Sequence, residues 1–261
     1  MRYVRLWLSF LRTSWMADIE YRANISVRVF GEVIWYMSQL SVFEVLYTHT
    51  DSINGWDVHA MRVFMGTLFL VDGLYMILFS ENLDHLFSVV RKGDLDLYLA
   101  KPVNSQFMVS CRKISVSFVL NLLMVLTYLI WAVQNLNRPV APAQILTFSM
   151  LAVCGVITSY ALRFMFSTLG VVLQEAGNIQ FLWYQLYRLA TRPDPIYPNY
   201  LRYLILTLFP VGFFASVPSR ALVEGLYWPL MIAGPALAVG SLLLSNILWE
   251  RALRRYSSAS S

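Results

Sequence analysis

Side chains able to do chemistry are few in this sequence and widely separated. The chain of 261 residues has three histidines and two cysteines. It contains no Gly-x-x-x-x-Gly-Lys-Ser/Thr loop for nucleotide phosphates, no His-Glu-x-x-His or Cys-x-x-Cys metal motif and no Gly-x-Ser-x-Gly nucleophile turn. We therefore expect no catalytic residue and no nucleotide-binding site in this chain.

Some side chains could in principle bind a metal or form a disulfide, but their positions in the sequence favour neither. Four potential metal ligands flank one loop: His49, Asp51, Asp57 and His59. Asn54-Gly55 at its centre predicts a tight turn, and we favour a polar turn over a metal site. Cys111 lies beside basic residues and Cys154 in an apolar run, so we expect two unpaired thiols, since a disulfide requires Cα atoms within about 7 Å.

The composition indicates that much of the surface faces lipid. Hydrophobic residues make up 58% of the chain and charged residues 13%, and the mean hydropathy is +0.57. A soluble domain keeps about a quarter of its residues charged. We predict an all-α polytopic membrane protein, because helices satisfy their own backbone hydrogen bonds inside a bilayer.

The N-terminal segment 1–17 is amphipathic. At helical spacing Arg2, Arg5, Ser9 and Arg12 share one narrow face, and Trp and Leu residues fill the rest. This pattern is typical of a helix that lies in the membrane interface. A cleaved signal peptide is the alternative, but Arg12 interrupts the apolar run and no small-x-small cleavage site follows.

Six apolar segments approach the twenty or so residues that a bilayer requires. They are 29–47, 60–80, 114–133, 145–170, 201–217 and 226–249. We therefore predict one membrane domain over 1–261. Its parts are an interfacial helix and linker (1–28), spans one and two (29–80), a loop (81–113), spans three to six (114–249) and a tail (250–261).

The distribution of Lys and Arg predicts the orientation. Most of the twenty basic residues fall on one side if both termini are cytoplasmic. That side includes Arg188, Arg192 and Arg202, which we place around a linker at 174–200 between spans four and five. Topology thus explains the net charge of +5, and we expect no nucleic acid partner.

Two charges lie deep in predicted spans. Asp72 in span two and Arg163 in span four are each about 10–12 Å from the cytoplasmic ends assigned to those spans, at 1.5 Å per residue. A lone charge at that depth is costly, so we predict an Asp72–Arg163 ion pair. Glu32 in span one is the competing partner for Arg163.

Two prolines interrupt the predicted fifth span. Pro210 and Pro218 are too close together for an unbroken helix, and the freed carbonyls need protein or water partners. We predict a broken, partly re-entrant element near the outer leaflet. An ordinary kinked span is the alternative.

The loop at 81–113 contains a pattern typical of a short docking helix. Gly93 interrupts the first helical stretch, Asp94 could cap the next, and Pro102 ends it. Leu95 and Leu99 share one face of that helix, beside Asp96. Such a helix suits docking into a partner protein, and an interfacial helix resting on lipid is the alternative.

Here the sequence resembles the six-span permease subunits of type-two ABC exporters, in a small bacterial branch. The motif that carries the resemblance is Arg91-x-Gly93-x-Leu95-Asp96-x-x-Leu99-x-Lys101-Pro102. Tyr197-Pro198, Pro210-Val211 and Pro218 form a second match. The resemblance covers essentially the whole chain.

The resemblance implies an N-terminal elbow helix, six spans and a partly re-entrant element after the fifth. It implies that the segment Arg91 to Pro102, Asp94 included, is a coupling helix that contacts a separate ATPase. It also implies a second permease, identical or related, two ATPase subunits that bind ATP and Mg, and no cofactor on this chain. The location implied is the bacterial inner membrane.

Two other functions stay open on the residues alone. Asp72 would suit an ion-driven secondary transporter, because intramembrane carboxylates bind protons and cations. A membrane-embedded lipid-modifying enzyme would need reactive groups converging at one depth, and no motif predicts such a site.

Overall fold

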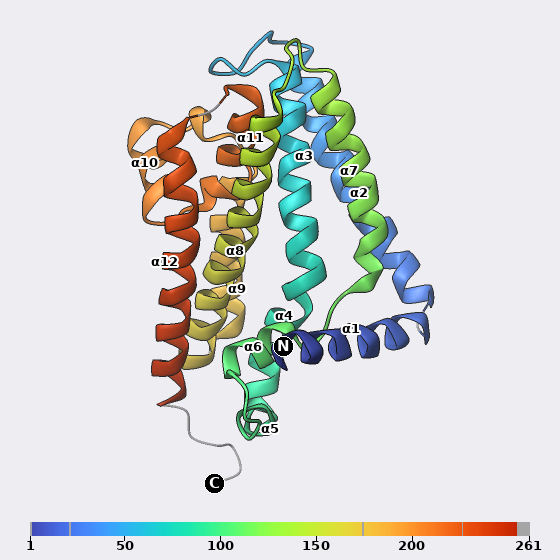
Figure 1. The fold of residues 1–261 in the computed structure, drawn as a ribbon, viewed down its shortest axis with the longest axis vertical. Coiled ribbons are helices and arrows are strands. Elements are labelled where there is room, and N and C mark those ends of the chain that lie inside the picture. The colour runs from blue at the N-terminus through green and yellow to red at the C-terminus, as the bar shows by residue number, and fades with distance from the viewer. Residues whose placement is uncertain (1, 21, 174, 226, 255–261) are drawn as a thin grey trace.

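The structure is a computed structural model, and it describes residues 2–20, 22–173, 175–225 and 227–254. In this part of the chain every regular element is helical, as predicted. The long helices run side by side along the molecule (Figure 1). They are α2 (Arg22–Tyr47), α3 (Val58–Tyr75), α7 (Val119–Gln134), α8 (Pro142–Leu173), α9 (Ala176–Ala190) and α12 (Trp228–Leu253).

Shorter elements occupy the two ends of this bundle. We call the end that carries α4, α5 and α6 the tip end, and the opposite end, with the loop at 48–57, the turn end (Figure 1). At the tip end lie α1 (Arg2–Glu20), η1 (Met76–Ser80), α4 (Glu81–Arg91), α5 (Leu95–Leu99), α6 (Ser105–Cys111) and η2 (Val116–Phe118). In the half nearer the turn end lie η3 (Asp194–Ile196), α10 (Asn199–Thr207), η4 (Val211–Phe213) and α11 (Ser216–Val223).

Four helices of the described chain are long and apolar enough to cross a membrane: residues 26–47, the continuous run 58–91, and α8 and α12. The shorter α7 is also apolar. Most of the run 58–91 is buried inside the protein, whereas few residues of 26–47 are buried. The helix α3 is therefore the centre of the bundle, and α2 lies at its edge.

The amphipathic N-terminal helix is confirmed. α1 lies across the tip end at a steep angle to the long helices (Figure 1). Trp7 and Leu11 pack against a small buried cluster that contains Ile114 and Phe118, and the Ser14 hydroxyl accepts a hydrogen bond from the Ile114 amide at 3.1 Å. Arg5 and Arg12 on the other face are exposed, which is the arrangement expected of a helix lying in an interface.

The loop at 48–57 is a tight polar turn, as predicted. Asn54 and Gly55 both have positive φ, at +50° and +85°, a combination that glycine and asparagine tolerate. Asp57 accepts a hydrogen bond from the Ala60 amide at 2.8 Å and thereby caps α3. In the described chain, no three His, Cys, Asp or Glu side chains converge as a metal site. Cys111 and Cys154 are unpaired.

The predicted fifth span is wrong. The segment 174–200, predicted to be a cytoplasmic linker, contains the helix α9, which runs from the tip end back to the turn end beside α8. Trp183 on α9 packs against Phe166 of α8 with ring centroids 5.7 Å apart. After α9, the side-chain amide of Asn54 donates a hydrogen bond to the Pro195 carbonyl at 2.9 Å, which places Pro195 at the turn end.

This correction moves three basic residues. Arg188, Arg192 and Arg202 lie in the half nearer the turn end, not at the tip end with the N-terminal helix. The basic residues of α1, of 91–113 and of the end of α12 keep their places at the tip end. The charge asymmetry on which the orientation was predicted is therefore weaker than the sequence indicated.

The predicted element at 201–217 is a half-length hairpin, which we define as residues 199–223 (α10, η4 and α11). Its turn reaches the middle of α8, since a Cβ at Gly155 would lie 2.5 Å from the Phe213 carbonyl oxygen. Gly155 is thirteen residues into the 32-residue α8, or about 20 Å along it at 1.5 Å per residue. α11 then returns the chain to the turn end, where α12 begins.

Candidate functional site

The tip at 91–104 is positioned by a helix that continues out of the bundle. α3 passes through the π-helical turn η1 into α4 without a break. Gly93 ends α4 with φ at +78°, while the Gly93 and Asp94 amides bond to the Val90 and Val89 carbonyls. Glycine is favoured here because a side chain strains the left-handed conformation. The reversal places α5 at the extremity of the molecule (Figure 1).

The two leucines predicted to share a docking face on α5 have different environments. Leu95 is 1% exposed and packs in a cluster with Leu83, Leu86 and Val109 of the same chain. Leu99 is 36% exposed. The prediction that Leu95 offers an accessible docking surface is wrong, because in this short helix its side chain anchors α5 to α4 and α6.

The accessible apolar residue that sequence reasoning missed is Leu97, which is 68% exposed. The charged residues around it, Arg91, Lys92, Asp94 and Lys101, are also exposed, and Asp96 is half-buried. Asp94 does not cap α5: its backbone is helical and its side chain makes no capping hydrogen bond. Leu97 was not singled out because an i, i+4 pattern selects Leu95 and Leu99 and ignores the residue between them.

Pro102 follows α5 in the tip, and Asn104, the last residue of the tip, precedes α6. The Asn104 side-chain oxygen accepts a hydrogen bond from the Phe107 amide at 3.0 Å, which caps α6. The Arg112 guanidinium at the end of α6 lies 4.9 Å from the ring centre of Tyr98 on α5 and donates to its hydroxyl. The tip is thus attached to α6 as well as to α4.

A buried set of polar side chains around Gln106, the Gln106 network, joins α6 to two long helices. The Gln106 amide nitrogen donates to the Tyr160 hydroxyl on α8 at 3.1 Å and to the Ser245 hydroxyl on α12 at 3.0 Å. Its amide oxygen accepts from Asn246 at 3.0 Å. Close by, the Trp249 ring nitrogen donates to the Ser105 hydroxyl at 3.0 Å. These partners are too distant in sequence for a local pattern to predict them.

The predicted Asp72–Arg163 ion pair is wrong. Arg163 on α8 donates to the Asp84 carboxylate on α4 at 2.6 Å. Its guanidinium also lies 5.7 Å from the ring centre of Trp183. The prediction failed because the second span was ended at residue 80, whereas the helical run continues to Arg91 and brings a different carboxylate to α8. The pair still joins the second and fourth long helices, one turn beyond η1.

Asp72 has a neutral partner instead. Its carboxylate accepts a hydrogen bond from the Tyr187 hydroxyl on α9 at 2.7 Å. The sequence could not indicate this contact, because Tyr187 was assigned to a cytoplasmic linker. The hydrogen bond ties α3 to α9 in the middle of the bundle.

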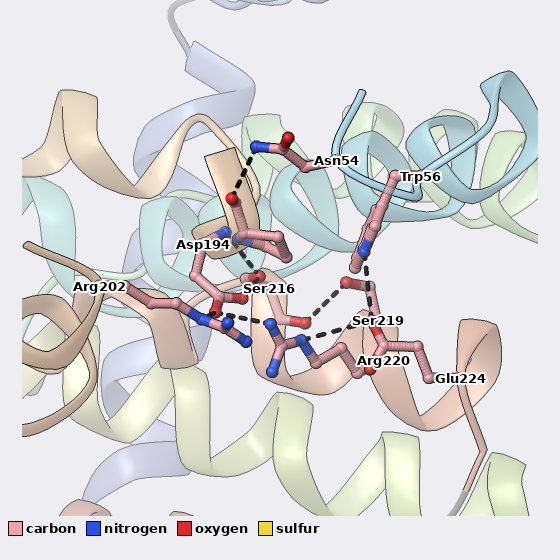
Figure 2. A network of polar contacts seen from close by, with 9 residues as sticks. Asn54, Trp56, Asp194, Arg202, Ser216, Ser219, Arg220 and Glu224 are labelled. Carbon is pink, nitrogen blue, oxygen red and sulfur yellow. Dashed lines mark hydrogen bonds and ion pairs between the residues drawn. The ribbon is translucent and has the colours of Figure 1, made fainter. Parts of the chain in front are cut away.

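A second buried polar set lies near the turn end, and we call it the Asp194 network (Figure 2). Asp194 has no exposed surface. One carboxylate oxygen accepts from Arg202 on α10 and from Arg220 on α11, each at 2.6 Å. The other oxygen accepts from the Ser216 hydroxyl, whose oxygen in turn accepts from the Asp194 amide at 3.0 Å.

The same network holds the hairpin to the 48–57 turn. The Trp56 ring nitrogen donates to the Glu224 carboxylate at 3.2 Å, and Glu224 lies 3.6 Å from Arg220 (Figure 2). Pro210 precedes η4 at the turn of the hairpin and Pro218 lies in the first turn of α11. The break that these prolines predicted is present. The buried Arg220 of the hairpin was a sequence signal for a buried acidic partner that the sequence-based prediction did not use.

The thiol of Cys111 lies at the end of α6 and is mostly buried. Burial raises the pKa of this thiol to about 12, because the low-dielectric surroundings disfavour the thiolate. At neutral pH the thiol is therefore neutral and a poor nucleophile. This agrees with a structural position rather than a reactive one.

Fold and site together define a polytopic helical membrane protein. A short helical tip projects from one end and is tied by buried polar contacts to its long helices. Near the other end, the half-length hairpin is fixed by a buried carboxylate.

A family model described as ABC-2 family transporter protein matches residues 33–260. The chain therefore belongs to the ABC-2 transporter family, and it is an integral membrane permease subunit of an ABC transporter. Neither the curated proteins nor the solved structures give a match to the chain.

Proposed function

We propose that this chain is the permease of an ATP-driven exporter of the bacterial inner membrane, with both termini in the cytoplasm. In this assembly two ATPase subunits bind ATP and Mg, and a second permease, identical or related, completes the path. The tip at 91–104 is the element that contacts the ATPase. The single observation that carries the proposal is the exposure of Leu97 at the extremity of a tip that is otherwise tied to the bundle.

The physical argument concerns how a movement would be transmitted. A docking helix must present an apolar anchor to its partner and must also be held firmly by its own chain. Leu97 supplies the anchor, and the partly exposed Leu99 adds apolar surface on another face of α5. Leu95 and the Gln106 network supply the attachment to α4, α6, α8 and α12.

The exposed apolar face of α2 supports a partner within the membrane. Its outward residues include Phe30, Ile34, Met37, Val42 and Val45. Lipid and a second permease both suit such a face, because each offers an apolar surface without unpaired charge. We assign it to the second permease and the surrounding lipid together.

The test uses the tagged chain purified from its native membrane in a mild detergent. We expect Mg-dependent ATP hydrolysis to copurify with the wild-type chain and to fall at least tenfold in the Leu97→Asp, Leu99→Asp double variant. A charge placed in an apolar anchor pocket of an interface costs several kcal/mol. Tyr200→Asp is the control for a negative charge added elsewhere, since Tyr200 is exposed near the turn end, away from the tip.

Two outcomes would contradict the proposal. One is full copurification of ATPase activity with the double variant, which would place the contact elsewhere. The other is loss of activity in the Tyr200→Asp control as well, which would show a general effect of added negative charge. Equal yield and equal gel-filtration profile of all three proteins are required for the comparison.

A further inference from the structure

A cavity between the last turns of α8 and α12 has no place in the proposed coupling. Its volume is about 400 Å³, and it is lined by Met165, Thr168, Leu169, Val172, Leu248, Arg251, Ala252 and Arg254. The two helices lie side by side and both end at the tip end (Figure 1). The cavity therefore opens at the tip-end termini of two helices that are long and apolar enough to cross a membrane.

The charges of the cavity are of one sign. Among the described residues that line it, Arg251 and Arg254 are the charged ones and none is acidic. The salt bridges identified in the described part of the chain include neither arginine. Two guanidinium groups at the mouth of a cavity with no carboxylate present a fork of donors suited to a phosphate.

The remaining lining is apolar, with one polar exception. Thr168 is buried, and its hydroxyl has no hydrogen-bond partner within the described chain. Other helical threonines, such as Thr127 and Thr147, donate to the carbonyl four residues earlier. A buried hydroxyl without a partner is costly, and a ligand that carries acceptor oxygens into the cavity would supply one.

The surface that continues from the cavity into the bilayer is made of exposed apolar side chains. Leu169 and Val172 on α8 and Leu244 and Leu248 on α12 are all at least partly exposed to the surroundings. An acyl chain can lie along such a surface, while its headgroup stays at the level of the arginines. Basic pockets between membrane helices bind phosphate headgroups in this way.

We propose that the α8–α12 cavity binds the phosphate headgroup of an anionic phospholipid, with Arg251 and Arg254 on the phosphate and Thr168 donating to one of its oxygens. The acyl chains lie against the leucines of α8 and α12. This site is independent of the proposed ATPase contact, because it requires only the lipid and this chain.

The test measures binding of short-chain phosphatidylglycerol to the purified chain in an uncharged detergent, by native mass spectrometry and by thermal stabilisation. Phosphatidylcholine of the same chain length and inorganic phosphate are the comparison ligands. We expect the anionic lipid to bind at least tenfold more tightly than the zwitterionic lipid. Inorganic phosphate, which has no apolar part, should bind far more weakly than either.

The variants separate the parts of the site. Arg251→Gln with Arg254→Gln should weaken phosphatidylglycerol binding about 25-fold, since each basic residue near an anionic headgroup contributes about fivefold. The corresponding double change to lysine should retain most of the binding. Thr168→Val, which keeps the volume, should weaken it a few-fold without loss of fold. Arg91→Gln with Lys92→Gln removes the same charge outside the cavity and is the control for lipid binding.

The proposal is overturned if the two lipids bind equally, or if the double glutamine variant binds phosphatidylglycerol as the wild type does. Saturation by inorganic phosphate at the same concentration would indicate a site for the free anion and not for a lipid. A loss of binding in the Arg91, Lys92 control equal to that in the cavity variant would show a general charge effect. None of these outcomes depends on ATPase activity, so failure here leaves the coupling proposal standing.

Discussion

The buried carboxylate of Asp194 gives a quantitative test of how the hairpin is held. Asp194→Asn changes one oxygen to an amide and removes the negative charge between Arg202 and Arg220. Asparagine must then direct an NH₂ donor either at the guanidinium groups or at the Ser216 hydroxyl. Arg220 is left without its closest counter-charge in a site where its side chain is 11% exposed.

The magnitude follows from the exposure of the partners. Removing one member of a buried ion pair costs about 3–5 kcal/mol, because the other charge stays buried and uncompensated. Arg202 reduces this cost, since its side chain is 38% exposed and can be hydrated. Glu224 gives Arg220 a weaker second contact at 3.6 Å. We expect a loss of about 2–4 kcal/mol in the free energy of unfolding.

The assay is reversible unfolding of the purified chain by SDS in mixed micelles, followed by tryptophan fluorescence. Asp51→Asn is the control, because Asp51 is exposed in the 48–57 turn; it should change stability by no more than about 0.5 kcal/mol. Adding Arg220→Gln to Asp194→Asn should restore part of the loss, with a coupling energy of at least about 1 kcal/mol. Wild-type stability in Asp194→Asn would refute the reasoning, as would strict additivity of the two changes.

Three further predictions follow from other contacts. Asp84→Arg should lower the yield of folded chain, because it places two cations together, and adding Arg163→Asp should restore the yield in part. The yield of membrane-extracted protein is measured by fluorescent gel filtration. Equal yields in the single and double variants would refute the ion pair. Gly155→Ala should cost about 1–3 kcal/mol in the same SDS assay, because its Cβ would overlap the Phe213 carbonyl oxygen, and an unchanged midpoint would show that the hairpin does not approach α8. Maleimide labelling of Cys111 at pH 8 should be at least about a hundredfold slower than labelling of an exposed thiol, since burial raises its pKa to about 12. Its rate should keep rising beyond pH 10, where an exposed thiol levels off; a plateau below pH 10 would contradict the burial.

Hydropathy identified the long helices that are apolar over most of their length, whether buried or exposed, and misassigned the segment 174–217. α2, α3, α7, α8 and α12 correspond to predicted apolar segments. α9 was missed because Asn178, Gln185 and Arg188 interrupt its apolar pattern. A helix with one face against α8 needs only an apolar stripe and not an apolar circumference. The opposite error occurred at 201–217. Apolar residues there pack inside the protein, and their hydropathy led to the prediction of a membrane span.

Asp72 and Arg163 show why the depth of a charge within a span does not identify its ion-pair partner. Asp72 and Arg163 were paired because both lay at a similar distance from assumed span ends. The depth of a charge depends on where its helix ends, and the helix of Asp72 continues through η1 to Arg91. That continuation supplies Asp84 to Arg163, and α9 supplies Tyr187 to Asp72. Both partners lie in segments that the sequence alone assigned to loops.

In the proposed assembly, α8 is the helix that would transmit a movement from the tip end to the hairpin near the turn end. At the tip end it holds α4 through Arg163 and α6 through Tyr160. Eight residues from Arg163 towards the turn end, or about 12 Å along the helix, Gly155 lies directly against the turn of the hairpin. The Asp194 network then fixes that hairpin to the turn end.

A displacement of the tip must therefore either move α8 as a rigid body or break buried polar contacts that are costly to lose. Rigid-body movement is the cheaper course, because α8 has no proline beyond its first residue and is tightly packed over most of its length. In an exporter with the ATPase at the tip, that movement would carry the turn of the hairpin with it. Under the proposed function, the hairpin, and not α2, would then be the part of this chain whose position follows a movement of the tip.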